Sequence, residues 1–222
     1  QANVKGINAS EFPVIPEPDD ESRIRMEPAV LKRVISQVAF AAATDDSRPS
    51  LTGVLTTFDG NRVTMAATDG FRLSVRSAHI AGYVEKPFNI IIPARALNEV
   101  ARIITDDLEA VYISMPAGRN QIIFDLDNVL LVSQLIDGKF PDYGPIIPKT
   151  HNTRTVLNTA EFTKACRTAD IFARESSNTA RVAVEPGDGL SPASATVAAN
   201  SKETGDNVAQ VDANVEGMPI EI

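Results

Sequence analysis

Two short acidic stretches place carboxylates close enough together to suggest metal chemistry. They read FDLDN (residues 124–128) and TDD (residues 105–107). Carboxylate and amide oxygens suit hard divalent cations, so an acidic metal-dependent enzyme is one hypothesis. However, FDLDN lacks the glycine and the distal glutamate of an EF-hand loop. We therefore interpret it as a hairpin turn, and TDD, like TDDS (residues 44–47), as a helix end.

Other catalytic and metal-binding patterns are absent from the sequence. It has no G-x-G-x-x-G, no G-x-x-x-x-G-K-[ST] and no H-E-x-x-H. His79 and His151 have no partner at a recognisable spacing, and the single cysteine, Cys166, falls on the apolar face of a predicted helix. One cysteine provides neither an intrachain disulfide nor a zinc cluster. We predict a protein that is not an enzyme and needs no cofactor.

Cationic side chains recur on three predicted amphipathic helices. They are Lys32, Arg33, Arg95, Arg102, Lys164, Arg167 and Arg174. Considered alone, they are ordinary solvated helix faces. If all three helices faced the same way, they would instead form a positive surface that contacts phosphates without reading bases. Few aromatic residues are interleaved with them, which argues against a stacking platform for single strands.

The stretch ATDGFRL (residues 67–73) places an arginine between two large apolar residues, directly after a turn. Gly70 lets the backbone turn tightly. Arg72 can bury its stem and offer a fork of donors to a peptide carbonyl or carboxylate. By themselves, these residues are described more simply as a corner between two strands with a surface arginine.

The helices that carry the cations are predicted at residues 26–43, from Pro93, and from Asn158, an N-cap candidate with Glu161 three residues later. Their apolar faces consist of Leu31, Val34, Ile35 and Val38; of Leu97, Val100, Ala101 and Ile104; and of Phe162, Ala165, Cys166 and Ala169.

Strands are predicted at residues 50–58, 62–70, 71–80, 88–94, 110–115, 121–126, 129–136, 180–186, 194–200 and 209–216. Asp59-Gly60 is a strong hairpin signal between the first two strands. A weak internal repeat of about 130 residues gives helix, polar loop, strand, turn and strand twice. The predicted fold class is α+β, with tandem domains of antiparallel sheets backed by few helices.

Composition sets further bounds on the function. The chain has 222 residues, a net charge of −8 and 43% hydrophobic residues, and its pI is near 4.8. This balance argues against a uniformly basic nucleic-acid binder but permits a local basic surface. No apolar run is long enough for a transmembrane helix, and no signal peptide is visible. With a single cysteine, these features fit the cytoplasm. The start at Gln1 and the end at VEGMPIEI, which reads as mid-strand, suggest a fragment.

Several motifs together resemble one family. ATDGFRL, IIPARALNEVARII, LIDGKFPDYGPIIPK, FARESSNTARVAV and VEGMPIEI occur in this order over nearly the whole chain. They are similar to the bacterial DNA polymerase III β subunit, the sliding clamp. The tandem TDGxRL and LIDGxFPDY signatures, roughly 65 residues apart, are specific, whereas TDG alone would be weak.

The resemblance implies the DNA-clamp fold, a ring of two protomers with three similar domains each, whose helices line a central pore. On this basis residues 1–24 are the end of the first domain and its linker, and residues 25–140 are the second domain. Residues 141–153 are a connector, and residues 154–222 are the first half of the third domain. The missing parts would leave this chain unable to close a ring.

Two working surfaces follow from the resemblance. The seven helix cations match the pore, with Arg48 in a loop near the DNA. A peptide pocket between the second and third domains matches Leu51, Thr68, Gly70, Phe71, Arg72, Leu73, Pro141 and Ile146. Phe71 stands where many members have His or Tyr, and Pro145 where some carry a basic residue. The pocket also uses residues near the family's C-terminus, so here it would be open on one side.

The implied function is to tether the replicative polymerase to duplex DNA without sequence preference and to dock replication and repair proteins. The implied partners are the polymerase III alpha subunit, clamp-loader subunits, other proteins with clamp-binding motifs and, for the full-length protein, a second copy; no membrane is involved. Two alternatives remain: the acidic metal-dependent enzyme, and an interaction module that keeps the fold but not the pocket.

Overall fold

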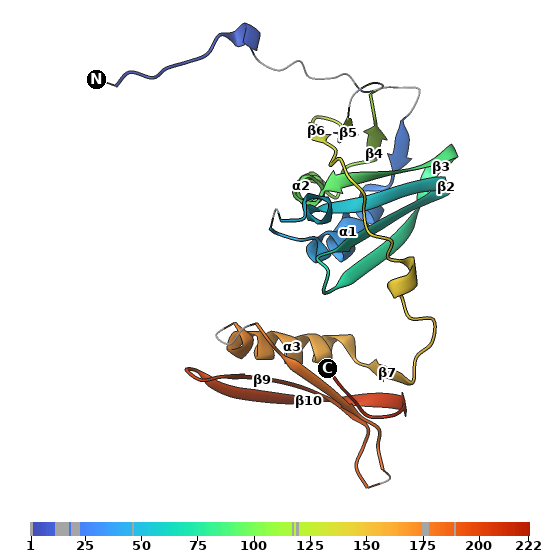
Figure 1. Ribbon diagram of the computed structural model, residues 1–222, viewed down its shortest axis with the longest axis vertical. Coiled ribbons are helices and arrows are strands. Elements are labelled where there is room, and N and C mark those ends of the chain that lie inside the picture. The colour runs from blue at the N-terminus through green and yellow to red at the C-terminus, as the bar shows by residue number, and fades with distance from the viewer. Residues whose placement is uncertain are drawn as a thin grey trace. The chain divides into compact units, whose positions relative to one another are not determined.

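The computed structural model describes residues 2–11, 18, 23–45, 47–116, 118, 120–174, 178–188 and 190–222. The chain divides into two compact units, Gln1–Tyr143 and Gly144–Ile222. Each unit has its own antiparallel sheet and its own helices (Figure 1). The predicted α+β class is thereby confirmed. Within the described residues, no helix combines the length and apolarity that crossing a bilayer requires.

The first unit contains a six-stranded sheet in the order β2-β3-β1-β4-β5-β6. Its strands are β1 (Ile24–Met26), β2 (Gly53–Thr68), β3 (Leu73–Pro93), β4 (Val111–Ser114), β5 (Gln121–Asp125) and β6 (Leu130–Gln134). Its helices are α1 (Pro28–Val38) and α2 (Ala94–Ile103), with short 3-10 turns η1 (Ala9–Glu11), η2 (Ala39–Ala41) and η3 (Pro49–Thr52).

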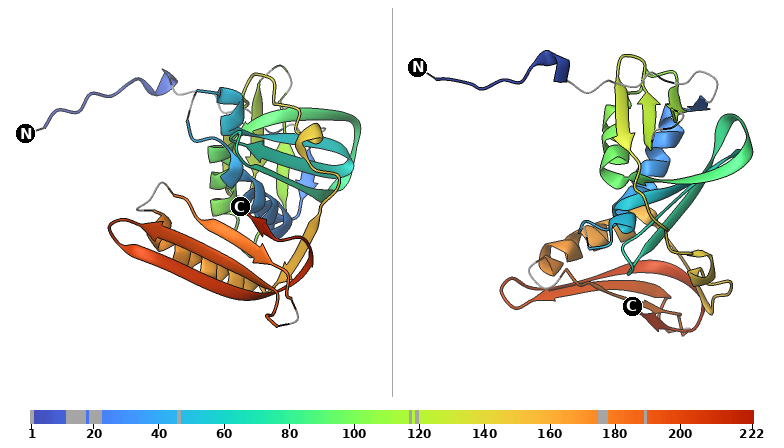
Figure 2. Two further views of the ribbon diagram at one scale, coloured as in Figure 1. Left: turned by 60° about the horizontal axis from the view of Figure 1, so that its bottom comes forward. Right: turned by 45° about the horizontal axis from the view of Figure 1, so that its top comes forward.

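The prediction of a hairpin at Asp59-Gly60 is wrong. Strand β2 continues through these residues and pairs with β3 from Gly53↔Pro93 to Thr68↔Leu73. The register shifts on both sides of Gly60, which has a φ of +56°, so the glycine accommodates an irregularity within the ladder instead of a chain reversal. The reversal lies at residues 69–72, and the four strands expected here form one long, curved hairpin (Figure 2).

Helices α1 and α2 pack against the sheet and against each other. Their predicted apolar faces are confirmed, because Leu31, Ile35, Leu97 and Val100 are fully buried in the main core. The first helix is shorter than expected, since regular α-helix ends at Val38 and continues as η2. In the second, Pro93 is the residue preceding the helix and not its first member.

A satellite cluster anchors the segment that follows β6 to this unit. Phe140 packs with Leu51 and Ile91, and the backbone N–H of Ile136 donates to the carbonyl of Ile91 at 2.9 Å. Leu51 is only 3% exposed. The part of the chain that carries Pro141 therefore begins from a fixed point on the first unit.

The second unit contains a five-stranded sheet in the order β11-β8-β9-β10-β7 and the helix α3. Its elements are η4 (Gly144–Ile146), β7 (Thr153–Leu157), α3 (Thr159–Ala173), β8 (Arg181–Glu185), β9 (Ser194–Ser201), β10 (Gly205–Gly217) and β11 (Ile220–Glu221). Strand β7 is an edge strand that the sequence did not predict, because TRTVL is short and flanked by polar residues. Strand β1, only three residues long, was also missed.

Helix α3 lies along one face of β9 and β10 (Figure 2). Its predicted N-cap is confirmed, since the Asn158 Oδ1 accepts from the backbone N–H groups of Ala160 and Glu161. The buried residues between the helix and the sheet are small: Ala165, Ala169, Ala173, Val197, Ala199 and Val211; Leu157, Phe162 and Phe172 pack against them and are partly buried. Cys166 is half-buried at the edge of this core.

Candidate functional site

The reversal between β2 and β3 is held by its own side chains; together with Thr68, the last residue of β2, we call it the Asp69 loop, residues 68–72. Asp69 Oδ1 accepts from the backbone N–H groups of Phe71 at 2.9 Å and Arg72 at 3.1 Å. Thr68 Oγ1 accepts from the N–H of Gly70 at 3.0 Å. The hydrogen bonds from Phe71 and then Arg72 hold the pKa of the Asp69 carboxyl below its usual range, so the carboxylate is ionised at neutral pH.

Arg72 is directed by two contacts. Its Nε donates to Asp69 Oδ2 at 3.1 Å, and its guanidinium lies 5.4 Å from the centroid of the Phe40 ring. Nearby, the hydroxyl of Ser74 donates to the carbonyl of Gln37 at 2.6 Å, which ties the start of β3 to the end of α1. The loop is thus fixed, yet Phe71 at its tip is 97% exposed.

The other residues predicted for a peptide pocket are distributed as follows. Leu73 is half-buried at the first position of β3. Leu51 is buried in the satellite cluster, so it packs beneath the surface and offers little apolar area to a ligand. Pro141 is exposed directly after Phe140. Ile146 is 67% exposed and belongs to the second unit, so it is described apart from the loop.

Arg48 also belongs to the surroundings of the Asp69 loop. Its Nη2 donates to the carbonyl of Asp69 at 3.0 Å. The family resemblance implied that this residue lies near DNA, and the structure gives it a contact with the candidate peptide loop.

The cations of α1 and α2 all lie on exposed faces, but they differ in their contacts. Lys32 Nζ donates to the carbonyl of Ile104 at 2.9 Å and so caps the end of α2. Arg102 Nε donates to Glu99 at 2.9 Å, and this hydrogen bond lowers the pKa of Glu99. Arg33 and Arg95, as far as the described residues show, extend without a polar partner.

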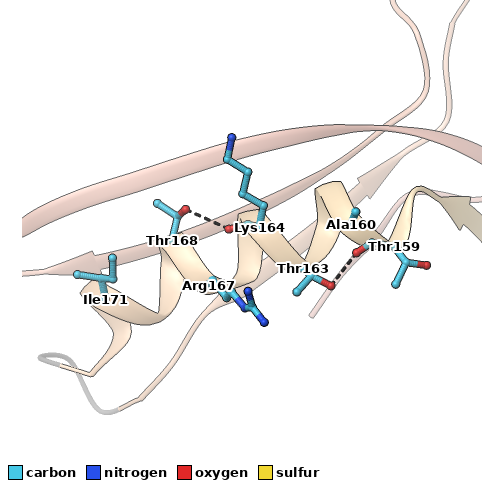
Figure 3. Close-up of a pocket in the computed structure, with 7 residues that line it drawn as sticks. All are labelled: Thr159, Ala160, Thr163, Lys164, Arg167, Thr168 and Ile171. Atoms are coloured by element: carbon cyan, nitrogen blue, oxygen red, sulfur yellow. Dashed lines mark hydrogen bonds between the residues drawn. The ribbon is translucent and has the colours of Figure 1, made fainter.

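The cations of α3 likewise include one that is paired with a carboxylate and, within the described residues, two that are not. Arg174, at the C-cap, pairs with Asp170. Lys164 and Arg167 line a shallow, open hollow along the exposed face of the helix and extend in different directions (Figure 3). The threonines on either side of this pair satisfy their hydroxyls within the helix, since Thr163 donates to the carbonyl of Thr159 and Thr168 to that of Lys164. Over the part of the chain that the structure describes, the side-chain nitrogens of Lys164 and Arg167 have no polar partner, which leaves both cations available to an anionic partner.

The acidic stretches meet around one open cavity of the first unit. FDLDN forms the turn between β5 and β6, as predicted, with the Leu126 N–H donating to the Val129 carbonyl at 2.9 Å. Asp107 and Glu109 follow α2, and they line this cavity with Asp125, Asp127 and the cationic Arg25. Over the described part of the chain, no three His, Cys, Asp or Glu side chains form a group that could hold a metal ion.

Two contributors to the site were missed by the sequence analysis. Phe40, 57% exposed beneath Arg72, was counted only as part of a helix. Asp69 was quoted within the motif but given no role. An available signal was the Asp-Gly pair itself, because aspartate readily accepts from backbone N–H groups two and three residues ahead.

Residues 25–142 match the family described as DNA polymerase III beta subunit, central domain. The chain belongs to the DNA polymerase III beta subunit family. The match contains the Asp69 loop, Arg48 and the cations of α1 and α2, whereas Ile146 and helix α3 lie beyond it.

Curated relatives extend the similarity to the rest of the chain. The beta sliding clamp of Bacillus subtilis (strain 168) is 32% identical over 222 residues, which cover 99% of this chain and 57% of the relative. The beta sliding clamp of Staphylococcus aureus (strain Mu50 / ATCC 700699) is 34% identical over 221 residues, 99% of this chain and 56% of the relative. The chain thus spans little more than half the length of these beta subunit relatives.

Solved structures of beta subunits share the fold. A DNA polymerase sliding clamp from Bacillus subtilis superposes with a TM-score of 0.84 at 32% identity, covering 97% of this chain and 55% of that one. A DNA polymerase III beta chain from Streptococcus pneumoniae TIGR4 superposes with a TM-score of 0.81 at 30% identity, covering 99% of this chain and 56% of that one. The expectation of the DNA-clamp fold is confirmed.

Proposed function

We propose that this chain is part of a DNA sliding clamp, which encircles duplex DNA, tethers the replicative polymerase and docks replication and repair proteins through a peptide pocket. The relatives' names and the shared fold support this function. Within the chain, the observation that carries it is a loop held by its own hydrogen bonds, whose tip exposes Phe71 almost completely and whose next residue, Arg72, is fixed by Asp69. An exposed aromatic ring on a fixed loop suits a short peptide with apolar anchors.

The complete protein is proposed to act in the cytoplasm as a homodimeric ring without catalysis or a cofactor. Its proposed partners are duplex DNA, the polymerase III alpha subunit, clamp-loader subunits and other proteins with clamp-binding motifs. The proposal includes four segments. Residues 1–24 are the end of the first clamp domain and its linker, and residues 25–140 are the second domain. Residues 141–153 are the connector, and residues 154–222 are the first half of the third domain. The proposed peptide pocket comprises Leu51, Thr68, Gly70, Phe71, Arg72, Leu73, Pro141 and Ile146.

Fluorescence anisotropy with a labelled Gln-Leu-Ser-Leu-Phe peptide tests the docking function. We expect micromolar binding to the chain, and its loss in Leu73→Ala and in Arg72→Ala. Binding that these substitutions leave unchanged would place the peptide elsewhere. If the chain is folded but does not bind the peptide, the result would favour the alternative of an interaction module that keeps the fold but lacks the pocket.

The DNA contact is tested by the dependence of binding on salt. Arg33 and Arg95 are exposed and lack a described polar partner, so each is expected to neutralise about one phosphate. The double substitution to alanine should lower the slope of log K against log salt by about 1.8. Arg62→Ala, at an exposed residue of β2, removes one charge away from the helices and is the control. An equal change in slope per charge removed in the two proteins would contradict the helix-face interface.

For the metal-dependent alternative, the carboxylates around the acidic cavity provide a specific test. A bound divalent cation raises the melting temperature by mass action. We expect Mg²⁺ and Ca²⁺ to leave the melting temperature unchanged, and to do so equally in Asp127→Asn. A rise that Asp127→Asn removes would restore the enzyme hypothesis.

A further inference from the structure

The Asp69 loop is attached at both ends to strands, and Arg48, from outside the hairpin, donates a hydrogen bond to the backbone in its middle. Arg48 Nη2 donates to the carbonyl of Asp69 at 3.0 Å. This carbonyl belongs to the same residue whose carboxylate accepts from Phe71, Arg72 and the Arg72 side chain. Asp69 therefore connects Arg48 on one side to Arg72 on the other.

Gly70 provides the space for this arrangement. Its φ is +97°, and a Cβ built on it would lie 3.0 Å from Nη1 of Arg48 and 3.3 Å from Nη2. The guanidinium thus lies so close that it would have to give way by a few tenths of an ångström to a Cβ at position 70. Glycine suits the positive φ of this position and leaves room for the close approach of Arg48.

Arg48 itself stands on a fixed base. Its carbonyl accepts from the N–H of Leu51 at 2.9 Å, and the Leu51 carbonyl accepts from the N–H of Ala43 at 2.8 Å. Leu51 is buried in the satellite cluster with Phe140. The backbone of Arg48 is therefore held by a packed part of the first unit, and its side chain reaches from there to the loop.

We infer that Arg48 and Asp69 are positioning residues that hold the Asp69 loop in the shape that presents Phe71 and Arg72 to a peptide. This inference rests on the proposed docking function. Arg48 then acts through the backbone of Asp69, and Asp69 acts through the side chain of Arg72. On this inference, Arg48 serves the peptide surface and not the DNA surface.

Three variants separate the parts of this arrangement. Arg48→Met keeps the stem and removes the donors. Asp69→Asn keeps a side-chain oxygen that accepts from the backbone of the loop but loses the charge that pairs with Arg72. Asp69→Ala loses both. Arg76→Met, an exposed arginine on β3, is the matched control.

We expect the peptide to bind about tenfold more weakly to Arg48→Met and Asp69→Ala, the effect of one hydrogen bond with a charged partner. Asp69→Asn should give a smaller loss, and Arg76→Met none. The slope of DNA binding against salt should be the same in Arg48→Met as in the unsubstituted chain. A lower slope with unchanged peptide affinity would return Arg48 to the DNA surface and overturn the inference.

Amide hydrogen exchange without peptide provides a readout that does not depend on docking. The amides of residues 70–73 should exchange about tenfold faster in Arg48→Met and Asp69→Ala than in the unsubstituted chain. Their exchange rates should be unchanged in Arg76→Met. If the unsubstituted chain binds no peptide while exchange responds, the docking function fails and the positioning role stands. If exchange and affinity are both unchanged in Arg48→Met, the inference is wrong.

Discussion

Gly70 is constrained both by the backbone conformation of the loop and by the neighbouring side chain of Arg48. Replacing it with alanine imposes a positive φ on a residue with a Cβ and shifts the Arg48 guanidinium by a few tenths of an ångström. We expect Gly70→Ala to lower the free energy of unfolding by about 1–2 kcal/mol and to weaken peptide binding. Denaturant titration and anisotropy measure the two effects.

Gly82 provides the control for Gly70. Its φ is +134°, and a Cβ there would meet nothing within 4 Å. Gly82→Ala should therefore show backbone strain alone and leave peptide affinity unchanged. If both alanine variants weakened the peptide equally, displacement of Arg48 would not be the cause.

Asp69 gives the loop a defined dependence on pH. Its folded-state pKa lies below the ordinary value of 3.8, because the carboxylate accepts from the backbone of Phe71 and Arg72. Its contribution to stability is therefore fully present above that value and is lost as the pH falls through the lower, folded-state pKa. Melting curves from about pH 6 down to about pH 2 should show an acid-side loss that is smaller in Asp69→Asn. Equal losses in both proteins would contradict this origin.

At the residue scale, the sequence predicted the candidate loop but not what holds it. The motif ATDGFRL indicated a glycine turn with an arginine beside apolar residues, and this arrangement is present. The contact between Arg48 and Asp69 joins residues 21 positions apart. Such a contact depends on tertiary packing, which the spacing of residues along the chain does not encode.

At the scale of the element, the N-cap of α3 makes a testable contribution. Asn158 Oδ1 accepts two backbone N–H groups at 2.9 and 3.2 Å. Asn158→Ala should cost about 1 kcal/mol of stability in the second unit. Asn98→Ala, on the exposed face of α2, is the control and should be neutral or slightly stabilising, because alanine has the higher helix propensity. A neutral Asn158→Ala would mean that solvent replaces the cap.

The helices were predicted more accurately than the strands, for a physical reason. A 3.6-residue apolar period, as in Leu31 and Ile35, is a local signal that a single buried face produces. The β2–β3 hairpin depends on register instead. Asp59-Gly60 has the composition of a tight turn, but the partner residues in β3 continue the ladder past it. Which of two glycine-containing stretches reverses the chain is decided by pairing between distant residues.

At the scale of the whole molecule, the two units have separate cores, with no buried residue in common. We expect them to unfold in separate transitions. All three tyrosines lie in the first unit and the single cysteine in the second, so tyrosine fluorescence and thiol reactivity of Cys166 report on different units.

Core substitutions test this separation. Leu97→Ala should destabilise the transition seen by tyrosine fluorescence by about 2–5 kcal/mol. Val197→Ala should destabilise the transition seen by Cys166 by roughly 1–3 kcal/mol. Each variant is the control for the other. If either substitution shifted both transitions together, the units would be one cooperative structure.

The alanine-lined face of α3 sets limits on how this protein can diverge. The core of the first unit contains Phe58, Phe124 and Met26, whose volume can be exchanged among neighbours as the sequence drifts. Under α3, the buried neighbours of Ala169 are alanines and valines, so a larger residue there has no large buried side chain among the described residues that can shrink in compensation. We expect the interior of the first unit to vary more freely among descendants of this sequence, while the small residues beneath α3 persist.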